Sequence, residues 1–282
     1  METIVVDDGS SDDTVRVAQA FSGTRCVSQA RGGLARARNR GLKESTGRYI
    51  VFLDADDALA PGALDIGVAE LAAHPAAAFV FGRCRTMIGD GTLVWTINEP
   101  RVERDHYREL LKRNYIWMPA TVMFRRDDVE RIGGFDPTVN AAADYSVYLR
   151  IARTRPIRDH GQVVAHYRKH AANMSGNATR MLQESLTVLR RERAFIEGDP
   201  ALLAAYYEGW EYWRDFYGSE VVEEIRRHIG AREFGRAARK SAVLGWLHPQ
   251  ALAHFATRKV VSKVRWRRKA AHTPASSGPE HD

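Results

Sequence analysis

The sequence has 282 residues and a formal net charge of +7, with 44% hydrophobic and 9% aromatic residues. A chain of this length and composition is typical of a soluble globular protein, and it buries enough surface to need no disulfide or metal staples. Cys26 and Cys84 are far apart and lack metal-ligand spacing, which favours buried thiols in a reducing compartment. We expect no signal peptide, and no apolar run reaches the ~20 residues of a membrane span.

The first elements alternate between strands and helices. Residues 3–6 predict a short strand, an acidic Gly-Ser turn follows, and residues 15–20 predict a helix. After a second strand around residues 25–28, the segment 29–41 combines glycines, arginines and a helix start. Glycines let the backbone approach a ligand, and arginines at a helix start favour a phosphate. A solvated basic helix is the alternative for this segment.

Three carboxylates follow a strongly apolar segment. Residues 49–53 are large apolar or aromatic side chains that predict a buried strand of a parallel sheet, with Asp54, Asp56 and Asp57 directly after it. In open α/β sheets ligands bind beyond the carboxyl ends of the strands, so Asp54 and Asp56 are candidate site residues. Carboxylates this close repel one another unless a cation or hydrogen-bond donors offset them, and hard oxygen ligands suit Mg²⁺ or Mn²⁺ bridging to substrate phosphates. An acidic turn without a ligand is the alternative.

The middle of the chain continues the alternation. Asp144 stands at the start of a predicted helix, where the helix dipole stabilises a carboxylate, so it is either a functional group or an N-cap. Residues 163–170 predict a closing strand, so we do not expect His166 and His170 to form a two-histidine metal face. The other predicted elements are helices at 61–74, 106–113 and 144–152, strands at 77–82, 93–96 and 120–126, a hairpin turn at 89–91 and a tight turn at 133–137.

From about residue 179 the pattern changes to helical segments. Asp199 and Pro200 predict an N-cap followed by the first residue of a helix. Aromatic residues recur along that helix and indicate a packing face, with sugar stacking as the alternative. They are Tyr206, Tyr207, Trp210, Trp213, Phe216 and Tyr217. We expect a globular domain over residues 1–178, a helical extension over 179–270 and a disordered tail over 271–282.

Short motifs in a fixed order resemble the family 2 glycosyltransferases. Their order between residues 3 and 175, more than any single motif, carries the resemblance. They are Ile4-Val5-Val6-Asp7-Asp8-Gly9-Ser10, Gly33 with Ala37-Arg38-Asn39, Leu53-Asp54-Ala55-Asp56-Asp57, Gly133-Gly134-Phe135-Asp136, and Asp144-Tyr145 with Leu149-Arg150. The resemblance implies an α/β fold of the GT-A type, a nucleotide-diphospho-sugar transferase sandwich with a mostly parallel sheet and helices on both faces. The helical C-terminal extension would follow it.

The resemblance also implies a reaction and a set of site residues. A sugar would move with inversion from a nucleotide-diphosphate donor to an acceptor hydroxyl, assisted by Mg²⁺ or Mn²⁺. Asp54 and Asp56 match the metal-binding DxD motif, with Asp56 as the direct ligand, and Asp144 matches the catalytic base. The implied nucleotide-sugar-binding residues are Asp7 and Asp8 at the base, Arg38 and Asp54 near the diphosphate, and Arg168 and His170 over it.

These residue types suit that chemistry. A departing nucleoside diphosphate leaves negative charge that a cation can offset, and the sugar carbon becomes oxocarbenium-like. A carboxylate such as Asp144 can take the proton of the attacking hydroxyl. We expect a role in cell-surface polysaccharide or glycoconjugate synthesis on the cytoplasmic side of a bacterial membrane. The expected donor is a UDP-, GDP- or TDP-sugar, and the expected acceptor is a glycan or a lipid-linked glycan.

The sequence departs from the family pattern at two places. The family's first strand and helix, which precede the strand at residues 3–6 and supply part of the nucleotide pocket, are absent, which indicates a late-assigned start or a truncated copy. Their absence predicts a sheet without one central strand, so that apolar neighbours and backbone groups are left unpaired. The residue before Asp144, commonly Glu in the family, is Ala143. The alternative function is therefore a non-catalytic, GT-A-like binding module.

Basic residues gather between Arg258 and Lys269, interleaved with Val260, Val261, Val264 and Trp266. Such a cluster could touch anionic lipid, at ~1 kcal/mol per basic residue near the surface, bind nucleic acid, or be a solvated tail. The interleaved apolar residues favour peripheral contact with the inner face of the plasma membrane. We expect no specific nucleic-acid partner.

Overall fold

The computed structural model describes residues 1–88, 91–96, 100–170 and 173–252. The chain divides into two compact units, Met1–Val221 and Val222–Asp282. The predicted domain boundary after residue 178 does not coincide with this division and stays a prediction. The basic cluster and the tail predicted near the C-terminus lie outside the described residues.

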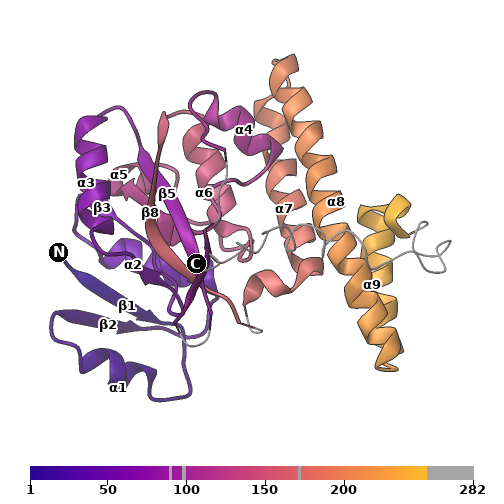
Figure 1. The fold of residues 1–282 in the computed structure, drawn as a ribbon, viewed down its shortest axis with the longest axis horizontal. Coiled ribbons are helices and arrows are strands. Elements are labelled where there is room, and N and C mark those ends of the chain that lie inside the picture. The colour runs from indigo at the N-terminus through magenta and orange to yellow at the C-terminus, as the bar shows by residue number, and fades with distance from the viewer. Residues whose placement is uncertain (89–90, 97–99, 171–172, 253–282) are drawn as a thin grey trace, which may run out of the picture. The chain divides into compact units, whose positions relative to one another are not determined.

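A six-stranded sheet forms the centre of the first unit (Figure 1). Its strands are β3 (Tyr49–Ile50), β4 (Ala58–Leu59), β5 (Phe79–Met87), β6 (Leu93–Thr96), β7 (Val122–Arg125) and β8 (Ile157–Arg168). Their order is β3-β7-β5-β8-β4, with β6 paired to β5. Only β5 and β8 run parallel among these described strands. The sheet is therefore mixed instead of mostly parallel, because an apolar run marks a buried strand whereas strand direction depends on the connection.

Helices cover both faces of this sheet, as predicted. They include α3 (Ala63–Ala73) and α6 (Ala143–Ala152), which lie on either side of β5 and β8 in Figure 1. Successive side chains of a strand point to opposite faces. In β5, Phe79 therefore faces Tyr148 of α6, with ring centroids 5.7 Å apart, while Val80 packs with Leu71 of α3. Burying such a side chain contributes about 1.5–3 kcal/mol.

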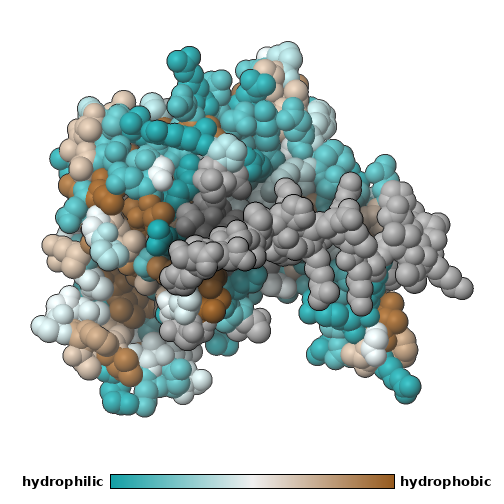
Figure 2. All heavy atoms as spheres, viewed as in Figure 1, coloured by the Kyte–Doolittle hydropathy of each residue, from teal (hydrophilic) through white to brown (hydrophobic). Residues whose placement is uncertain are grey.

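The first two strands form a separate parallel sheet, β1 (Thr3–Asp7) with β2 (Thr24–Ser28). The short helix α1 (Thr14–Gln19) lies between them in sequence, and α2 (Leu34–Glu44) follows. Residues 1–34 are all described, and Asp7 is the only one of them that is buried. Val17 and Phe21 are 49% and 65% exposed. The elements β1, α1 and β2 lie at the lower left of Figure 1, and hydrophobic residues are visible at the surface in the same region of Figure 2.

The short β3 corrects the strand predicted over residues 49–53. Only Tyr49 and Ile50 form a strand, and they pair antiparallel with β7 at one end of the sheet order. Phe52 is buried, but Leu53 is 48% exposed. In the described part of the chain β3 pairs only with β7, and β1 only with β2. Each of these two strands therefore has one side without a strand partner among the described residues, so the short β3 is an edge strand.

The remaining elements are helical, and two of them shorten the strand predicted over residues 120–126 to β7 (Val122–Arg125). They are α4 (His106–Lys112), η1 (Pro119–Thr121), α5 (Arg126–Arg131), η2 (Met174–Gly176), α7 (Ala178–Glu192), η3 (Arg193–Phe195), α8 (Pro200–Gly230) and α9 (Phe234–Leu247). Asp199 Oδ1 accepts the N–H groups of Ala201 and Leu202, which confirms the predicted helix start. No helix in the described ranges is both long and apolar enough to cross a membrane.

The aromatic residues of α8 divide between packing and exposure. Trp213 is 6% exposed and meets Tyr145 of α6 edge-on at 5.6 Å, so the predicted packing face is present there. Tyr207 and Phe216 are 57% and 47% exposed.

In the second unit, buried Glu224 pairs with Lys240 of α9 at 2.7 Å.

Candidate active site

Arg38 and Asp54 form an ion pair at the centre of the site. Arg38 lies with Ala35 and Leu42 on the buried face of α2, because residues three and four apart share one side of a helix. Its Nη2 donates to Asp54 Oδ1 at 2.7 Å, and its guanidinium lies 5.3 Å from the centre of the Phe135 ring. The Arg38 side chain is 8% exposed. Its Nε has no hydrogen-bond partner within the described residues, so a donor remains for another group.

Asp144 lies in the first turn of α6, close to this pair. Its Oδ1 accepts the N–H of Tyr145 at 2.8 Å. Burial raises the pKa of the Asp144 carboxyl to about 6, and the charge of Asp54 adds to the rise, whereas Arg38 and the Tyr145 N–H oppose it. The residue keeps partial exposure. Arg38 and Asp54 both shift the pKa of Asp144, so the three side chains lie near one another. They come from α2, from the loop after β3 and from the start of α6.

Tyr148 is one turn further along α6 and was not predicted as a site residue. Its hydroxyl is buried and has no hydrogen-bond partner within the described part of the chain. Burial raises the pKa of this hydroxyl well above its ordinary value, as does the charge of Asp144, while Arg38 lowers it. The spacing of four residues from Asp144 places both on one side of the helix and was the available signal.

A second cluster adjoins the first through the loop that follows Asp54. Asp56 Oδ2 lies 2.8 Å from His170 Nε2, and Arg168 Nε donates to the Asp56 carbonyl at 2.9 Å. The Arg168 N–H donates to Asp57 Oδ1 at 2.8 Å. Burial raises the pKa of Asp57 to about 6, and the charges of Asp56 and Asp54 add to the rise, although the Arg168 N–H opposes it. The last residue of β8 and the segment after it therefore contact the acidic loop.

Asp7 and Asp8 bind the protein's own backbone. Asp7 is buried and its Oδ1 accepts the N–H of Ser10 at 2.9 Å, and hydrogen bonds from Ser10 lower its pKa. Asp8 accepts the N–H groups of Gly32 and Gly33 at 2.7 and 2.8 Å. Gly33 is the N-cap of α2 and has φ +89°, a region that favours glycine. Asp8 therefore holds the glycine turn that starts the Arg38 helix.

The predicted site residues fall into three groups. Arg38, Asp54 and Asp144 converge, and Asp56, Arg168 and His170 adjoin them. Asp8 contacts the turn before α2, and Asp7 binds Ser10 in the turn after β1. The roles implied by the resemblance stay predictions. His166 lies within β8, which agrees with the predicted strand over that segment.

The acidic loop has the chemistry of a cation site. Three carboxylates stand within four positions, and their mutual repulsion contributes to the raised pKa of Asp57. Arg38 pairs with Asp54 and offsets part of that charge, and His170 Nε2 lies 2.8 Å from Asp56 Oδ2. In the described ranges, no group of three or more His, Cys, Asp or Glu residues is arranged to hold a metal ion. Two carboxylates completed by phosphate oxygens and water are a usual Mg²⁺ arrangement, so the residues present fit a metal that binds together with a diphosphate.

The α/β fold thus brings together a loop of carboxylates after a strand, a glycine turn before a helix and a carboxylate at a further helix start. Residues 1–133 match the profile described as Glycosyl transferase family 2. The chain is 26% identical over 180 residues to a chondroitin synthase of Escherichia coli, which covers 62% of this chain and 26% of that protein. It is 28% identical over 193 residues to the Escherichia coli UDP-Glc:alpha-D-GlcNAc-diphosphoundecaprenol beta-1,3-glucosyltransferase WfgD, covering 67% of this chain and 73% of that protein.

A solved structure supports the same fold. The mannosyltransferase PcManGT from Pyrobaculum calidifontis, in complex with GDP-Man and Mn²⁺, superposes with a TM-score of 0.56 at 20% identity, over 92% of this chain and 79% of that one. Residues 1–133 therefore match the family 2 glycosyltransferases, and the chain has the GT-A fold, as the motif order predicted. It spans only about a quarter of the chondroitin synthase that it matches.

Proposed function

We propose that the protein is an inverting glycosyltransferase that moves a sugar from a nucleotide-diphosphate donor to an acceptor hydroxyl. The convergence of Asp144 with the Arg38–Asp54 pair carries this proposal, because it combines a base with a group for the leaving diphosphate. The family match and the GT-A fold support it.

Asp144 would act as the base. A carboxyl whose pKa is raised to about 6 is ionised at neutral pH and still basic enough to take a proton from a hydroxyl. The acceptor oxygen would attack the anomeric carbon as its proton passes to Asp144, and the bond to the diphosphate would break on the opposite face. One base and one displacement are sufficient for inversion.

Arg38, Arg168 and His170 would hold the leaving diphosphate. Arg38 Nε has no hydrogen-bond partner among the described residues, and Arg168 and His170 contact Asp56. Asp54 and Asp56 would hold Mg²⁺ or Mn²⁺, which when bound supplies Lewis-acid stabilisation of the departing negative charge. Asp8 would keep the glycine turn and its N–H groups in place at the nucleotide, and Asp7 would hold the turn at Ser10.

Relatives suggest the class of substrate. WfgD is named for UDP-Glc and a diphosphoundecaprenol-linked acceptor, and PcManGT was solved with GDP-Man and Mn²⁺. We propose a UDP- or GDP-hexose donor and a glycan or lipid-linked glycan acceptor in cell-envelope polysaccharide synthesis. Peripheral attachment to anionic membrane through Arg258–Lys269 stays part of the proposal. Flotation with anionic vesicles, compared between the full chain and a chain ending at His254, tests it, and equal binding would contradict it.

Donor turnover tests the function. The full chain is incubated with UDP-glucose, UDP-N-acetylglucosamine, GDP-mannose and a TDP-sugar, with Mn²⁺, with Mg²⁺ or with EDTA, and nucleoside diphosphate release is measured. We expect metal-dependent release from at least one donor and its loss in Asp144→Asn. Absence of release from every donor would overturn the enzyme proposal.

The separate β1–β2 sheet favours one alternative, a GT-A-like module that binds nucleotide sugar without transferring it. In that case calorimetry would detect donor binding while no donor is turned over. Donor binding together with turnover would exclude the alternative.

A further inference from the structure

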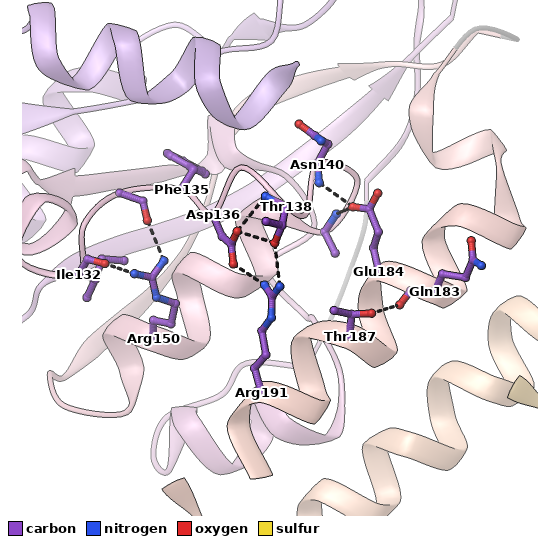
Figure 3. A network of polar contacts seen from close by, with 12 residues as sticks. Ile132, Phe135, Asp136, Thr138, Asn140, Arg150, Gln183, Glu184, Thr187 and Arg191 are labelled. Atoms are coloured by element: carbon purple, nitrogen blue, oxygen red, sulfur yellow. Dashed lines mark hydrogen bonds and ion pairs between the residues drawn. The ribbon is translucent and has the colours of Figure 1, made fainter. Parts of the chain in front are cut away.

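Helix α7 holds the loop that leads into α6. The Oε2 atom of Glu184 accepts the N–H groups of Asn140 at 2.7 Å and Ala142 at 3.2 Å, together with the N–H of Ala141 between them. Arg180 Nε donates to Glu184 Oε1 at 2.7 Å. Figure 3 shows Glu184 reaching from α7 to this loop. A single carboxylate oxygen thus binds three consecutive backbone donors.

This carboxylate stands at the N-terminal end of α6. The N-cap residue Ala142 provides no side-chain cap, and Ala143 after it is buried and carries no polar group. The first N–H groups of a helix lack partners within the helix, and the helix dipole favours negative charge at that end. Glu184 is only 15% exposed, so its charge-assisted hydrogen bonds are partly shielded from water.

The other side of the same loop rests on α2. Asn140 Oδ1 accepts the N–H of Ala35 at 3.2 Å. A Cβ on Gly33 would lie 2.9 Å from Asn140 Oδ1, so only glycine at the N-cap lets this side chain approach. Further along, Asn39 exchanges two hydrogen bonds with the backbone of Phe135, at 2.7 and 2.8 Å. The loop therefore joins the helix of Arg38 to the helix of Asp144.

We propose that Glu184 is a positioning residue that sets the start of α6 against α2, and so fixes Asp144 relative to Arg38 and Asp54. This inference rests on the proposed function of Asp144 as the base. Glu184 does not touch the reacting atoms. Its effect would be geometric, since misplacing a catalytic group by about 1 Å can cost a factor of about 100 in rate.

Arg191 is a matched control on the same helix and the same loop. It contacts Asp136 and donates to Thr138 Oγ1 at 2.7 Å (Figure 3), and both residues stand earlier in the loop than the three residues bound by Glu184. Arg191→Ala therefore removes a tether of the loop while it leaves the three N–H groups on Glu184. A merely structural role predicts similar rate losses for Arg191→Ala and Glu184→Ala.

The experiment compares Glu184→Ala, Glu184→Gln and Arg191→Ala in the full chain. The measurements are nucleoside diphosphate release from UDP-glucose, UDP-N-acetylglucosamine and GDP-mannose, donor affinity by calorimetry, and amide hydrogen exchange over residues 140–146. Glu184→Ala should lower kcat about 10- to 100-fold with donor affinity changed less than about threefold, and it should speed exchange. Glu184→Gln, whose carbonyl still accepts the N–H groups, should recover most of the rate, and Arg191→Ala should stay within about threefold of the unaltered protein.

A rate for Glu184→Ala within about threefold of the unaltered protein, or an equal loss in Arg191→Ala, would overturn the inference. If the unaltered protein turns over none of these donors, the proposed function fails, and hydrogen exchange still decides the geometry. Unchanged exchange over residues 140–146 in Glu184→Ala would then refute the role of Glu184.

Discussion

Asp144→Asn tests two effects of the Asp144 carboxyl, its contribution to activity and its effect on the free energy of unfolding. Asn has nearly the same shape, and its side-chain oxygen can still accept the Tyr145 N–H that now donates at 2.8 Å. The substitution removes the ionisable group whose pKa burial raises from 3.8 to about 6. Activity should therefore fall while stability at neutral pH rises.

The pKa of Asp144 is 3.8 in the unfolded chain and about 6 in the folded protein, and this difference makes the effect of the substitution on stability depend on pH. Below about pH 4 the carboxyl is protonated in the folded and unfolded states, and the substitution has little effect on the free energy of unfolding. Between about pH 4 and 6 the unfolded chain releases the proton first, so the folded protein loses stability as the pH rises. The difference between about 6 and 3.8 corresponds to about 3 kcal/mol, an upper value because Asp144 keeps partial exposure.

Urea denaturation at pH 4 and pH 7.5 measures this effect. Asp144→Asn should be more stable than the unaltered protein by about 1–3 kcal/mol at pH 7.5 and nearly equal to it at pH 4. Asp136→Asn is a control that should change the free energy of unfolding in the opposite direction. Burial alone would raise the pKa of Asp136, but hydrogen bonds from Thr138 and the charge of Arg191 lower it, so its loss should destabilise the protein at pH 7.5.

Activity supplies the second half of the test. The kcat of the unaltered protein should rise with pH through about 6 as Asp144 ionises, and Asp144→Asn should lose about 10²–10⁴-fold. If Asp144→Asn gains no stability at pH 7.5 relative to pH 4, the Asp144 carboxyl does not have a raised pKa, and if the variant retains most of the activity, Asp144 is not the base.

Three other substitutions probe the ion pairs. Asp56→Asn should abolish the stimulation of donor turnover by Mn²⁺, and an unchanged Mn²⁺ titration would contradict its role as ligand. Arg38→Ala removes the partner that lies 2.7 Å from Asp54 and should weaken UDP-glucose binding by about 1.5–3 kcal/mol in calorimetry, whereas equal affinity would argue against contact with the donor. Asp159→Ala removes the carboxylate bonded to Arg83 at 2.7 and 2.9 Å, and because that charge is buried we expect a loss of about 3–5 kcal/mol in urea denaturation. A loss below about 1 kcal/mol would show that water reaches the guanidinium.

Local signals in the sequence predicted most elements. The periodicity of residues 61–74 matches α3, and the Asp199-Pro200 pair marks the start of α8. The motif order predicted the family and the GT-A fold. These features depend on neighbours within a few residues, such as a cap or an apolar face, so they are visible along the chain.

Other features required the tertiary structure. The acidic residues after residue 53 were found, but the strand before them is short, because a strand's extent depends on partners that its own residues do not specify. The raised pKa of Asp144 comes from burial and from Asp54, a charge distant in sequence.

The sequence by itself determined which residue types stand at the strand and helix ends, and therefore the family and the candidate carboxylates. Only the tertiary structure decided which of them meet. Arg38 reaches Asp54, His170 reaches Asp56, and Glu184 reaches the loop before Asp144 from a helix 42 to 44 residues further along the chain. No local rule predicts such pairs, since they form only when separate helices and strands pack around one core.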